Sequence, residues 1–334
     1  MSEPLDLLII GAGPAGLSAA DAAAREGLSY LVIEKGTIAN TIRQYPVGRT
    51  LFSTPNELEM REGTLQPLRE KPTREELLSH YIHFVLDHDL RINAGEEVFD
   101  AERLEGDGFL VRTTRGQYRA ARLLFAIGAM DYPRRLNIPG EDLPKVHHRF
   151  IEPYQYVRKE ALVVGGGNSA AEAALFLSEE GAHTTMAIWR DDWENRDPKA
   201  GAMKHWVRTP LEREIAEGRL RVILYKHIDE ITEREVTLTA EAGEKLTIAN
   251  DVVFVLVGSD ADLTILRKLG VKTEPGRAAF TEVPVYDPQT FETNVPGVYV
   301  AGHFTNARHI KQAIEVPRRI VPLIAQSLRA TVER

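Results

Sequence analysis

The chain has 334 residues, of which 43% are hydrophobic and 27% are charged, which is ordinary for a soluble protein able to bury two cores. Acidic residues outnumber lysine and arginine 49 to 41, and the formal charge of −8 disfavours broad binding to nucleic acid or anionic membranes. The chain contains no cysteine, which excludes disulfides, thiolate metal sites and cysteine nucleophiles.

The start of the chain does not resemble a targeting signal. The segment "MSEPLDLLIIGAGPAG" lacks a basic region followed by an apolar region and a cleavage site. The strongest later apolar run, "VVFVLVG" at Val252 to Gly258, is far shorter than the about 20 residues of a membrane-spanning helix. We therefore expect a cytoplasmic protein with neither a membrane nor a nucleic acid as partner.

The N-terminal segment predicts a strand, a glycine turn, a helix and a second strand. An apolar run at residues 5–10 indicates a buried strand, and the alanine-rich stretch at 14–26 indicates a helix. The stretch "SYLVIEK" then predicts a strand that closes at Glu34. This order is typical of dinucleotide-binding domains.

The glycines of this turn have the spacing that a dinucleotide requires. Gly11, Gly13 and Gly16 form G-x-G-x-x-G: one for the tight turn, one for approach of a pyrophosphate, one for close packing of helix on strand. The N-terminus of the helix then faces the phosphates. Glu34 can accept hydrogen bonds from both ribose hydroxyls. The segment therefore predicts a dinucleotide site.

A helix is expected in "PTREELLSHYIHFVLDHD", because Thr73 and Glu76 have capping-box spacing and apolar residues follow on one face. On this helix Glu76, His80, His83 and Asp87 share a face that could in principle ligate a metal. We interpret the face as solvated and expect no metal site.

The middle of the chain predicts hairpin strands followed by a crossing segment. The short runs "EEVFDAERLEG", "GFLVRTTRG" and "YRAARLLFAIG" are separated by Gly and Asp, and the last indicates a buried strand ending at Gly128. The proline-rich "MDYPRRLNIPGEDLP" then indicates a crossing.

A second strand, glycine turn, helix and strand follow in "EALVVGGGNSAAEAALFLSEEGAHTTMAIWR". Gly165, Gly167 and Ala170 form G-x-G-x-x-A, a variant compatible with the same packing. This unit therefore predicts a second dinucleotide site.

The end of this second strand differs from that of the first. Arg190 stands where a guanidinium suits a 2′-phosphate, which favours NADPH. Asp191 and Asp192 follow, and they would oppose a phosphate if they faced it. The alternative is that Arg190 is an exposed surface charge.

The C-terminal third predicts a buried strand in "DVVFVLVGSDAD" and a strand, turn and helix in "TNVPGVYVAGHFTNARHIKQAIEV". Pro317 and Pro322 interrupt the helical pattern, so we expect a kink or a break there.

Two dinucleotide sites in one chain fit a protein that holds FAD and NAD(P)H together. Hydride passes directly between nicotinamide and flavin rings, so their close approach is the main requirement. We assign no side chain a catalytic role.

These segments resemble the thioredoxin reductase-like flavoprotein family over essentially the whole chain. The likeness rests on "GAGPAGLSAA", "FAIGAM", "VVGGGNSAAEAALFLS" and "TNVPGVYVAGH" followed by "KQAI". Within the family, "YPVGRTLFSTPNELE", "EKPTREE" and "VHHRFIEPYQY" are most similar to the bacillithiol disulfide reductase-like branch.

The resemblance implies an α/β fold of two Rossmann-like three-layer domains. It implies an FAD domain at 1–130 and 261–334, an NAD(P)H domain inserted at 131–260, and a homodimer. Tyr45, in "RQYPVG", becomes a candidate for stacking near the flavin. The implied FAD contacts are Gly11, Gly13, Pro14, Ala15, Gly16, Glu34, Lys35, Thr54, Val98, Gly128, Gly302, His303, Lys311, Gln312 and Ala313. The implied NADPH contacts are Gly165, Gly167, Asn168, Ser169, Ala170 and Arg190.

The sequence departs from the family at its redox positions. Thioredoxin reductases carry a Cys-x-x-Cys pair where this chain has His148 and Ile151, and the bacillithiol-type branch has a cysteine where this chain has Ala15. His303 replaces an Asp that contacts the ribityl chain in many relatives. His147, His148 and His303 remain open as candidates for proton transfer.

We therefore expect an FAD-dependent NAD(P)H oxidoreductase. We expect hydride to pass from NADPH to FAD, and electrons to pass on to a non-dithiol acceptor, as in a ferredoxin- or flavodoxin-NADP reductase. The alternatives are a reductase of low-molecular-weight, bacillithiol-type disulfides and a non-catalytic redox sensor whose domain angle a partner reads. We rank an oxygen-using monooxygenase below these.

Overall fold

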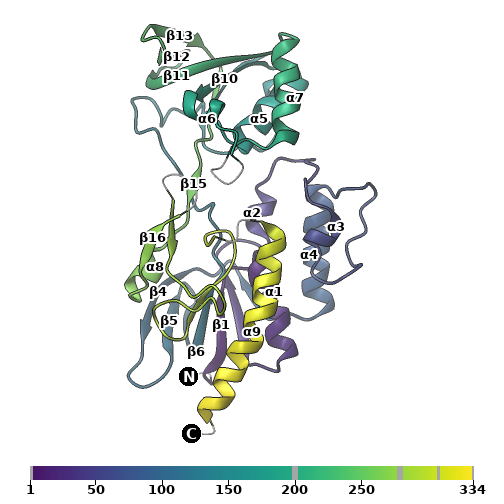
Figure 1. The fold of residues 1–334 in the computed structure, drawn as a ribbon, viewed down its shortest axis with the longest axis vertical. Helices are drawn as coiled ribbons and strands as arrows, with labels where there is room; N and C mark the ends of the chain where they lie inside the picture. The colour runs from purple at the N-terminus through teal and green to yellow at the C-terminus, as the bar shows by residue number, and fades with distance from the viewer. Residues whose placement is uncertain (1–2, 198–201, 277–280, 307–308, 333–334) are drawn as a thin grey trace. The chain divides into compact units, whose positions relative to one another are not determined.

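The computed structural model describes residues 3–197, 202–276, 281–306 and 309–332. These residues form two compact units (Figure 1). Unit 1 contains the described residues up to Asp131 and those from Ala261 onward. Unit 2 runs from Tyr132 to Asp260. Unit 2 is thus inserted between two parts of unit 1 along the chain.

A seven-stranded sheet forms the centre of unit 1, in the order β3-β2-β1-β6-β5-β4, with β18 also paired to β6. The strands β1, β2, β3, β6 and β18 pair in parallel, and β4, β5 and β6 form an antiparallel arm. The bounds are β1 Leu5–Ile10, β2 Tyr30–Glu34, β3 Ile92–Ala94, β4 Val98–Arg103, β5 Phe109–Thr113, β6 Gly116–Phe125 and β18 Val298–Val300.

Apolar layers cover both faces of this sheet. Leu7 and Ile9 point into one core with helices α1 (Pro14–Arg25) and α9 (Ile310–Val332), and α9 lies along α1 (Figure 1). Leu8 and Ile10, on the other face, pack in a second core. Alternate residues of β1 thus face opposite layers, as the two-residue period of a strand requires. The other helices of this unit are α2 Asn40–Arg43, α3 Pro55–Leu58, α4 Arg74–Asp87 and α8 Thr264–Lys268, and a small hairpin joins β16 Thr273–Pro275 to β17 Glu282–Pro284.

Helix α4 begins as its sequence predicts. The side chain of Thr73 accepts a hydrogen bond from the Glu76 N–H, and the Glu76 carboxylate accepts one from the Thr73 N–H at 2.7 Å. This reciprocal capping satisfies two N–H groups that a helix start otherwise leaves without partners.

Helix α9 continues through both of its prolines, so of the expected kink or break the break is absent. A proline inside a helix removes a backbone hydrogen bond and costs about 3 kcal/mol or more. Ile320, Val321 and Ile324 are fully buried between the prolines or just after them. We attribute the absence of a break to this burial, which offsets the cost of the missing bonds.

Unit 2 repeats the plan of unit 1. Its seven-stranded sheet has the order β13-β12-β11-β10-β9-β14-β8, in which β8, β9, β10, β11 and β14 pair in parallel and β12 and β13 form an antiparallel arm. The strands are β8 Val146–His147, β9 Glu160–Val164, β10 His183–Trp189, β11 Leu220–Ile231, β12 Glu235–Ala240, β13 Lys245–Ala249 and β14 Val252–Val255.

In the part of unit 2 that the structure describes, the remaining elements are three helices, one 3₁₀ turn and one small ribbon. Strands β7 (Tyr132–Pro133) and β15 (Ser259–Asp260) pair antiparallel where the chain enters and leaves the unit. The helices are α5 Asn168–Glu179, α6 Arg190–Glu194 and α7 His205–Ala216, and the 3₁₀ turn is Tyr154–Tyr156.

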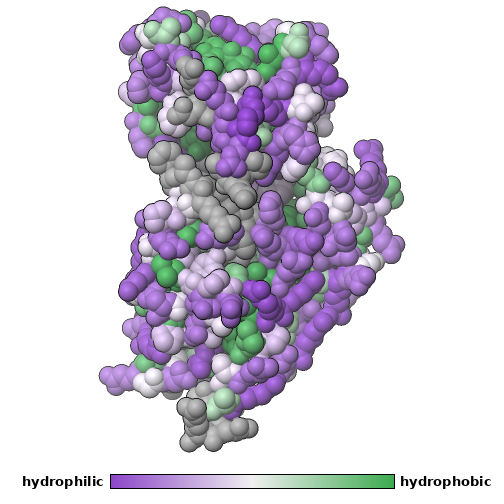
Figure 2. All heavy atoms as spheres, in the orientation of Figure 1, coloured by the Kyte–Doolittle hydropathy of each residue, from purple (hydrophilic) through white to green (hydrophobic). Residues whose placement is uncertain are grey.

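On the face drawn in Figure 2, hydrophilic side chains cover more of the surface than hydrophobic ones. Within the described ranges, none of the helices combines the length and apolar character needed to span a bilayer.

Candidate functional site

The first glycine turn, Gly11 to Gly16, joins β1 to α1 in unit 1. Gly11 has a φ of 107°, and a Cβ added there would lie 2.5 Å from the Ala126 carbonyl oxygen. A Cβ added to Gly16 would lie far inside 3.0 Å of the Gly11 oxygen, so only glycine lets the helix pack this closely. A Cβ added to Gly13 would meet nothing within 4 Å. The space beside Gly13 is what a pyrophosphate approaching the backbone requires.

Glu34 ends β2 next to this turn and is 7% exposed. One carboxylate oxygen accepts a hydrogen bond from the Ala12 N–H at 2.8 Å, and the other accepts one from the Gly36 N–H at 2.7 Å. A carboxylate has about four acceptor positions, so both oxygens can still accept a ribose hydroxyl. The turn, the helix N-terminus and this acid together fit the adenosine diphosphate part of FAD.

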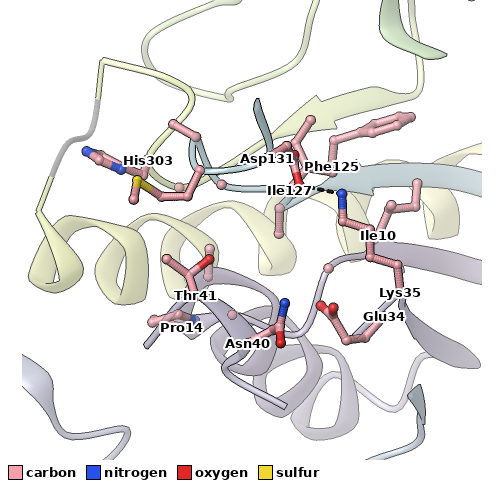
Figure 3. Close-up of a pocket in the computed structure, with 18 of the residues that line it drawn as sticks. Ile10, Pro14, Glu34, Lys35, Asn40, Thr41, Phe125, Ile127, Asp131 and His303 are labelled. Carbon is pink, nitrogen blue, oxygen red and sulfur yellow. Dashed lines mark hydrogen bonds and ion pairs between the residues drawn. The ribbon is translucent and has the colours of Figure 1, made fainter. Parts of the chain in front are cut away.

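One cavity in unit 1 brings together most of the predicted FAD contacts (Figure 3). It opens along the first glycine turn and extends to the loop after β18. The predicted residues that line it are Gly11, Gly13, Pro14, Ala15, Glu34, Lys35, Val98, Gly128, Gly302, His303 and Ala313.

Four predicted residues lie outside the lining of the cavity. Gly16 packs α1 against the turn, and Thr54 caps α3 together with Glu57. Lys311 and Gln312 are exposed on the first turn of α9, next to Ala313. Their contacts with FAD stay predictions.

The cavity also has walls that the sequence did not predict. Asn40 and Thr41 line it from α2, and Figure 3 shows them opposite Ile127. Ala39, just before them, adopts a left-handed conformation with a φ of 52°, and its N–H donates to the Ala12 carbonyl at 2.9 Å. Such a conformation is uncommon outside glycine, and no sequence signal marks this alanine for it.

Lys35 and Asp131 form an ion pair at the edge of the cavity, drawn as a dashed line in Figure 3. Asp131 is the last residue of unit 1 before the chain passes into unit 2. Lys35 follows Glu34, so the ion pair links the end of β2 to the last residue of the first part of unit 1.

Ala15 and His303 are two of the positions at which the sequence departs from the family, and both lie in unit 1. Ala15 is 4% exposed and lines the cavity, and a Cβ added to Gly302 would lie 3.2 Å from its methyl group. His303 is exposed, lines the same cavity and is labelled in Figure 3. His309, which the sequence analysis did not single out, also lines it. Two imidazoles therefore border the region that the resemblance assigns to the flavin.

The second glycine turn, Gly165 to Ala170, joins β9 to α5 in unit 2. Gly165 has a φ of 142°, and a Cβ added there would lie inside 3.0 Å of the Leu256 carbonyl oxygen. A Cβ added to Gly167 would meet nothing within 4 Å, as at Gly13. Ala170 is fully buried, so its methyl group fits where the first turn needs glycine. This cradle fits a second pyrophosphate.

The other predicted NADPH residues have different environments. The Asn168 side-chain oxygen accepts a hydrogen bond from the Lys204 N–H at 2.8 Å, which ties the segment before α7 to this turn. Ser169 is exposed on the first turn of α5. Arg190 begins α6, but its side chain lies outside the described residues.

The two candidate histidines of unit 2, His147 and His148, lie on and beside its edge strand β8. The ring of His147 packs against Phe254 with centroids 5.5 Å apart, and burial lowers the His147 pKa. His148 Nε2 lies 3.8 Å from the buried Glu141 carboxylate. Neither histidine is among the residues that line the cavity in unit 1.

The polar face of α4 is occupied by contacts within the protein. The Glu76 carboxylate accepts the Thr73 and Leu68 N–H groups, and His80 Nε2 lies 3.3 Å from the Met60 nitrogen. His83 Nδ1 lies 2.9 Å from the Ser79 carbonyl oxygen. In the described part of the chain, no group of three or more His, Cys, Asp or Glu side chains is placed to hold a metal.

Two solved structures are similar to the whole chain. Bacillithiol disulfide reductase Bdr from Staphylococcus aureus superposes with a TM-score of 0.89 at 31% identity, covering 99% of both chains. Thioredoxin reductase from T. acidophilum superposes with a TM-score of 0.78 at 22% identity, covering 98% of this chain and all of the other. These matches confirm the expected two-domain fold and the likeness to thioredoxin reductases.

Two curated relatives are similar in sequence. Bacilliredoxin reductase Bdr from Bacillus subtilis is 36% identical over 88% of each chain. A ferredoxin–NADP reductase from Ignicoccus hospitalis is 30% identical over 96% of this chain and 94% of its own length.

The family model of the pyridine nucleotide-disulphide oxidoreductases matches residues 8–302. The expected enzyme class and the expected cofactors, FAD and NADPH, are confirmed at the level of this family. The chain therefore belongs to the pyridine nucleotide-disulphide oxidoreductase family, as an NAD(P)H-dependent flavoprotein oxidoreductase.

Proposed function

We propose that this protein passes electrons from NADPH through FAD directly to an external acceptor, without a thiol of its own. The observation that carries the proposal is Ala15, a methyl group on the wall of the cavity in a chain that has no cysteine. A methyl group can neither attack a disulfide nor store electrons.

Unit 1 supplies the FAD site in this proposal. The first glycine turn and the N-terminus of α1 hold the pyrophosphate, and the Glu34 carboxylate holds the ribose. The N-cap residue Gly13 has no side chain to occupy the N–H groups of the first helical turn. Bound FAD supplies the ability to take up a hydride and to release electrons one or two at a time.

Unit 2 supplies the NADPH site. The second glycine turn repeats the geometry of the first, and Gly167 as N-cap leaves the start of α5 without a capping side chain. We retain Arg190 as the residue proposed to bind the 2′-phosphate, and residues 131–260 as the NADPH domain. The assignment of one nucleotide to each unit follows from the two cradles and from the family.

We propose ferredoxin or flavodoxin, a one-electron carrier, as the acceptor. A reductase without cysteine can deliver single electrons from flavin to such a carrier by close approach. The relative from Ignicoccus hospitalis, whose name states this activity, matches nearly the full chain and supports the proposal.

Reduction of a low-molecular-weight disulfide is the second candidate. The similarity to bacilliredoxin and bacillithiol disulfide reductases favours it. Ala15 opposes it, because the disulfide would have to be reduced without a covalent bond to the protein.

A panel of acceptors under NADPH, without air, separates these candidates. We expect reduction of ferredoxin or flavodoxin and no reduction of bacillithiol disulfide by the native protein. Ala15→Cys introduces a thiol at the wall of the cavity. This variant is the matched comparison for the native protein in the disulfide assay. Reduction of the disulfide by the native protein, with no response to either carrier, would reverse the ranking. Negligible turnover with every acceptor would favour the redox sensor.

We also propose that the protein works as a cytoplasmic homodimer, which the family resemblance implies. Sedimentation velocity of the holoprotein tests the dimer. A single species at the mass of one chain across the micromolar range contradicts it.

A further inference from the structure

A buried acid, Glu96, stands in the wall of the cavity in unit 1. Glu96 is fully buried and lines the cavity together with the two residues that follow it, Glu97 and Val98. Taking a carboxylate out of water is costly unless hydrogen bonds within the protein replace those lost to solvent. The surroundings of Glu96 must therefore supply hydrogen-bond donors.

Uncharged side chains donate to this carboxylate. The Tyr118 hydroxyl donates to Glu96 Oε1 at 3.0 Å, and the Thr113 hydroxyl donates to the same oxygen. The Asn93 amide donates to Glu96 Oε2 at 2.9 Å and to the Tyr118 oxygen at 3.1 Å. Burial, and next the hydrogen bond to Glu96, raise the pKa of Tyr118, so its hydroxyl keeps the proton that it donates. The carboxylate thus joins strands β3, β5 and β6.

The backbone beside this carboxylate is tied to the end of β2. The Glu96 N–H donates to the Glu34 carbonyl at 2.9 Å, and the Gly95 N–H donates to the Gly36 carbonyl at 2.9 Å. The Gly36 N–H in turn donates to the Glu34 carboxylate at 2.7 Å. A shift of residues 95–98 would therefore also move the residues that orient Glu34.

The same network fixes the strand that carries Val98. Thr113 pairs with Val98 in the register of β4 and β5, and its hydroxyl donates to Glu96. Asn93, Thr113 and Tyr118 are not among the residues that line the cavity. Their hydrogen bonds therefore reach the cavity wall through Glu96.

We propose that Glu96 is a positioning residue for the adenosine half of FAD. Glu34 is placed to receive the adenosine ribose, so the wall next to it borders the adenosine half of the cofactor. The Glu96 carboxylate holds this wall at Val98, and the backbone of the same segment holds Glu34. This inference rests on the proposed FAD site of unit 1.

Titration of the full-length protein, freed of FAD, with FAD and with ADP tests the inference. ADP is the adenosine diphosphate half of the cofactor without the flavin, and saturating NADP⁺ keeps it from the proposed site in unit 2. Glu96→Met keeps a side chain of similar length but removes the acceptor of the buried donors. We expect FAD and ADP each to bind about tenfold more weakly, because the whole loss lies in the adenosine half.

Tyr118→Phe tests the network from outside the cavity. It removes one hydroxyl that donates to Glu96, and we expect both ligands to bind about threefold more weakly. A purely structural role would lower the melting temperature of the FAD-free protein but leave both dissociation constants unchanged well below that temperature. This variant also keeps the readout if Glu96→Met does not fold.

Glu105→Met is the matched control, because it makes the same change at an exposed position after β4, away from the cavity. It should leave both dissociation constants unchanged. Unchanged constants in the folded variants of Glu96 and Tyr118, an equal weakening in the control, or weaker FAD with unchanged ADP overturns the inference. A native protein that binds neither FAD nor ADP contradicts the proposed function itself, so the two failures are distinguishable.

Discussion

The two glycine turns both have glycine at the first and second positions of their motif, but they differ at the third position. Gly11 and Gly165 both have positive φ values and both approach a carbonyl oxygen of a neighbouring loop. Gly13 and Gly167 both have open space beside them. At the third position, Gly16 has no room for a methyl group, whereas Ala170 carries one in the core. The two turns therefore differ in the room at their third position, whereas both have open space beside the second glycine.

We expect the largest effect on the free energy of unfolding when the third residue of one turn is replaced by the residue found in the other. Gly16→Ala places a methyl group against the Gly11 carbonyl, and we expect a loss of about 3 kcal/mol of unfolding free energy together with loss of FAD. The reverse change, Ala170→Gly, removes one methyl group and should cost about 1 kcal/mol. Denaturant unfolding of the two apoproteins measures both values. Equal losses would show that the turns pack alike.

The second glycines distinguish binding from stability. Gly13→Ala and Gly167→Ala put a methyl group into open space, so each variant should keep its stability or gain up to about 1 kcal/mol. Each methyl group then occupies the path of a pyrophosphate, and we expect about 100-fold weaker binding, or about 2.7 kcal/mol. Gly13→Ala should affect FAD alone, and Gly167→Ala should affect NADP⁺ alone. Loss of both nucleotides in either variant contradicts one site in each unit.

Glu34 tests the role of the acid beside the first turn. Glu34→Gln keeps the shape of the side chain but removes the negative charge of the carboxylate that accepts hydrogen bonds from the Ala12 and Gly36 N–H groups. FAD should therefore bind about 10-fold more weakly. Glu97→Gln is the control, because Glu97 is exposed on the wall of the same cavity. Fluorescence titration of the apoproteins with FAD measures both affinities. Equal weakening in the two variants would indicate only a general effect of charge.

The smallest effect concerns pH. Burial lowers the pKa of His80 in unit 1 and of His147 in unit 2 below 6.5. Below pH 6.5 each of these histidines binds more protons in the unfolded chain than in the folded one. The folded protein therefore keeps its full free energy of unfolding above pH 6.5 and loses part of it as the pH falls through the folded pKa of each histidine. His80→Gln and His147→Gln should each flatten the fall of melting temperature between about pH 7 and pH 5. A double variant with an unchanged slope would exclude both residues as its source.

Local spacing predicted the parts of the molecule that local geometry determines. The positions of Gly11, Gly13 and Gly16 are sufficient to predict the first turn, because a strand followed by a helix leaves few backbone paths. Thr73 and Glu76 predicted the start of α4 for the same reason, since a capping box involves only residues three apart.

Contacts between distant residues could not be read from the chain. Asp131 meets Lys35 across 96 residues, and no pattern in either segment indicates the other. From the sequence, Asp192 is a charge that would oppose a phosphate if it faced one, but whether it lies beside the second turn depends on the path of α6. The prolines of α9 predict a kink or a break, and the sequence does not show how deeply the apolar face around them is buried, which is what keeps the helix unbroken.

The central claim is that two cradles in one chain let NADPH reduce FAD. The most direct measurement is the visible spectrum of the purified protein, reconstituted with FAD and titrated with NADPH without air. We expect the absorption bands of oxidised flavin to bleach with about one equivalent of NADPH, since we propose one site of each kind in each chain. A protein that stays colourless with excess FAD, or one whose bands persist after excess NADPH, contradicts the account.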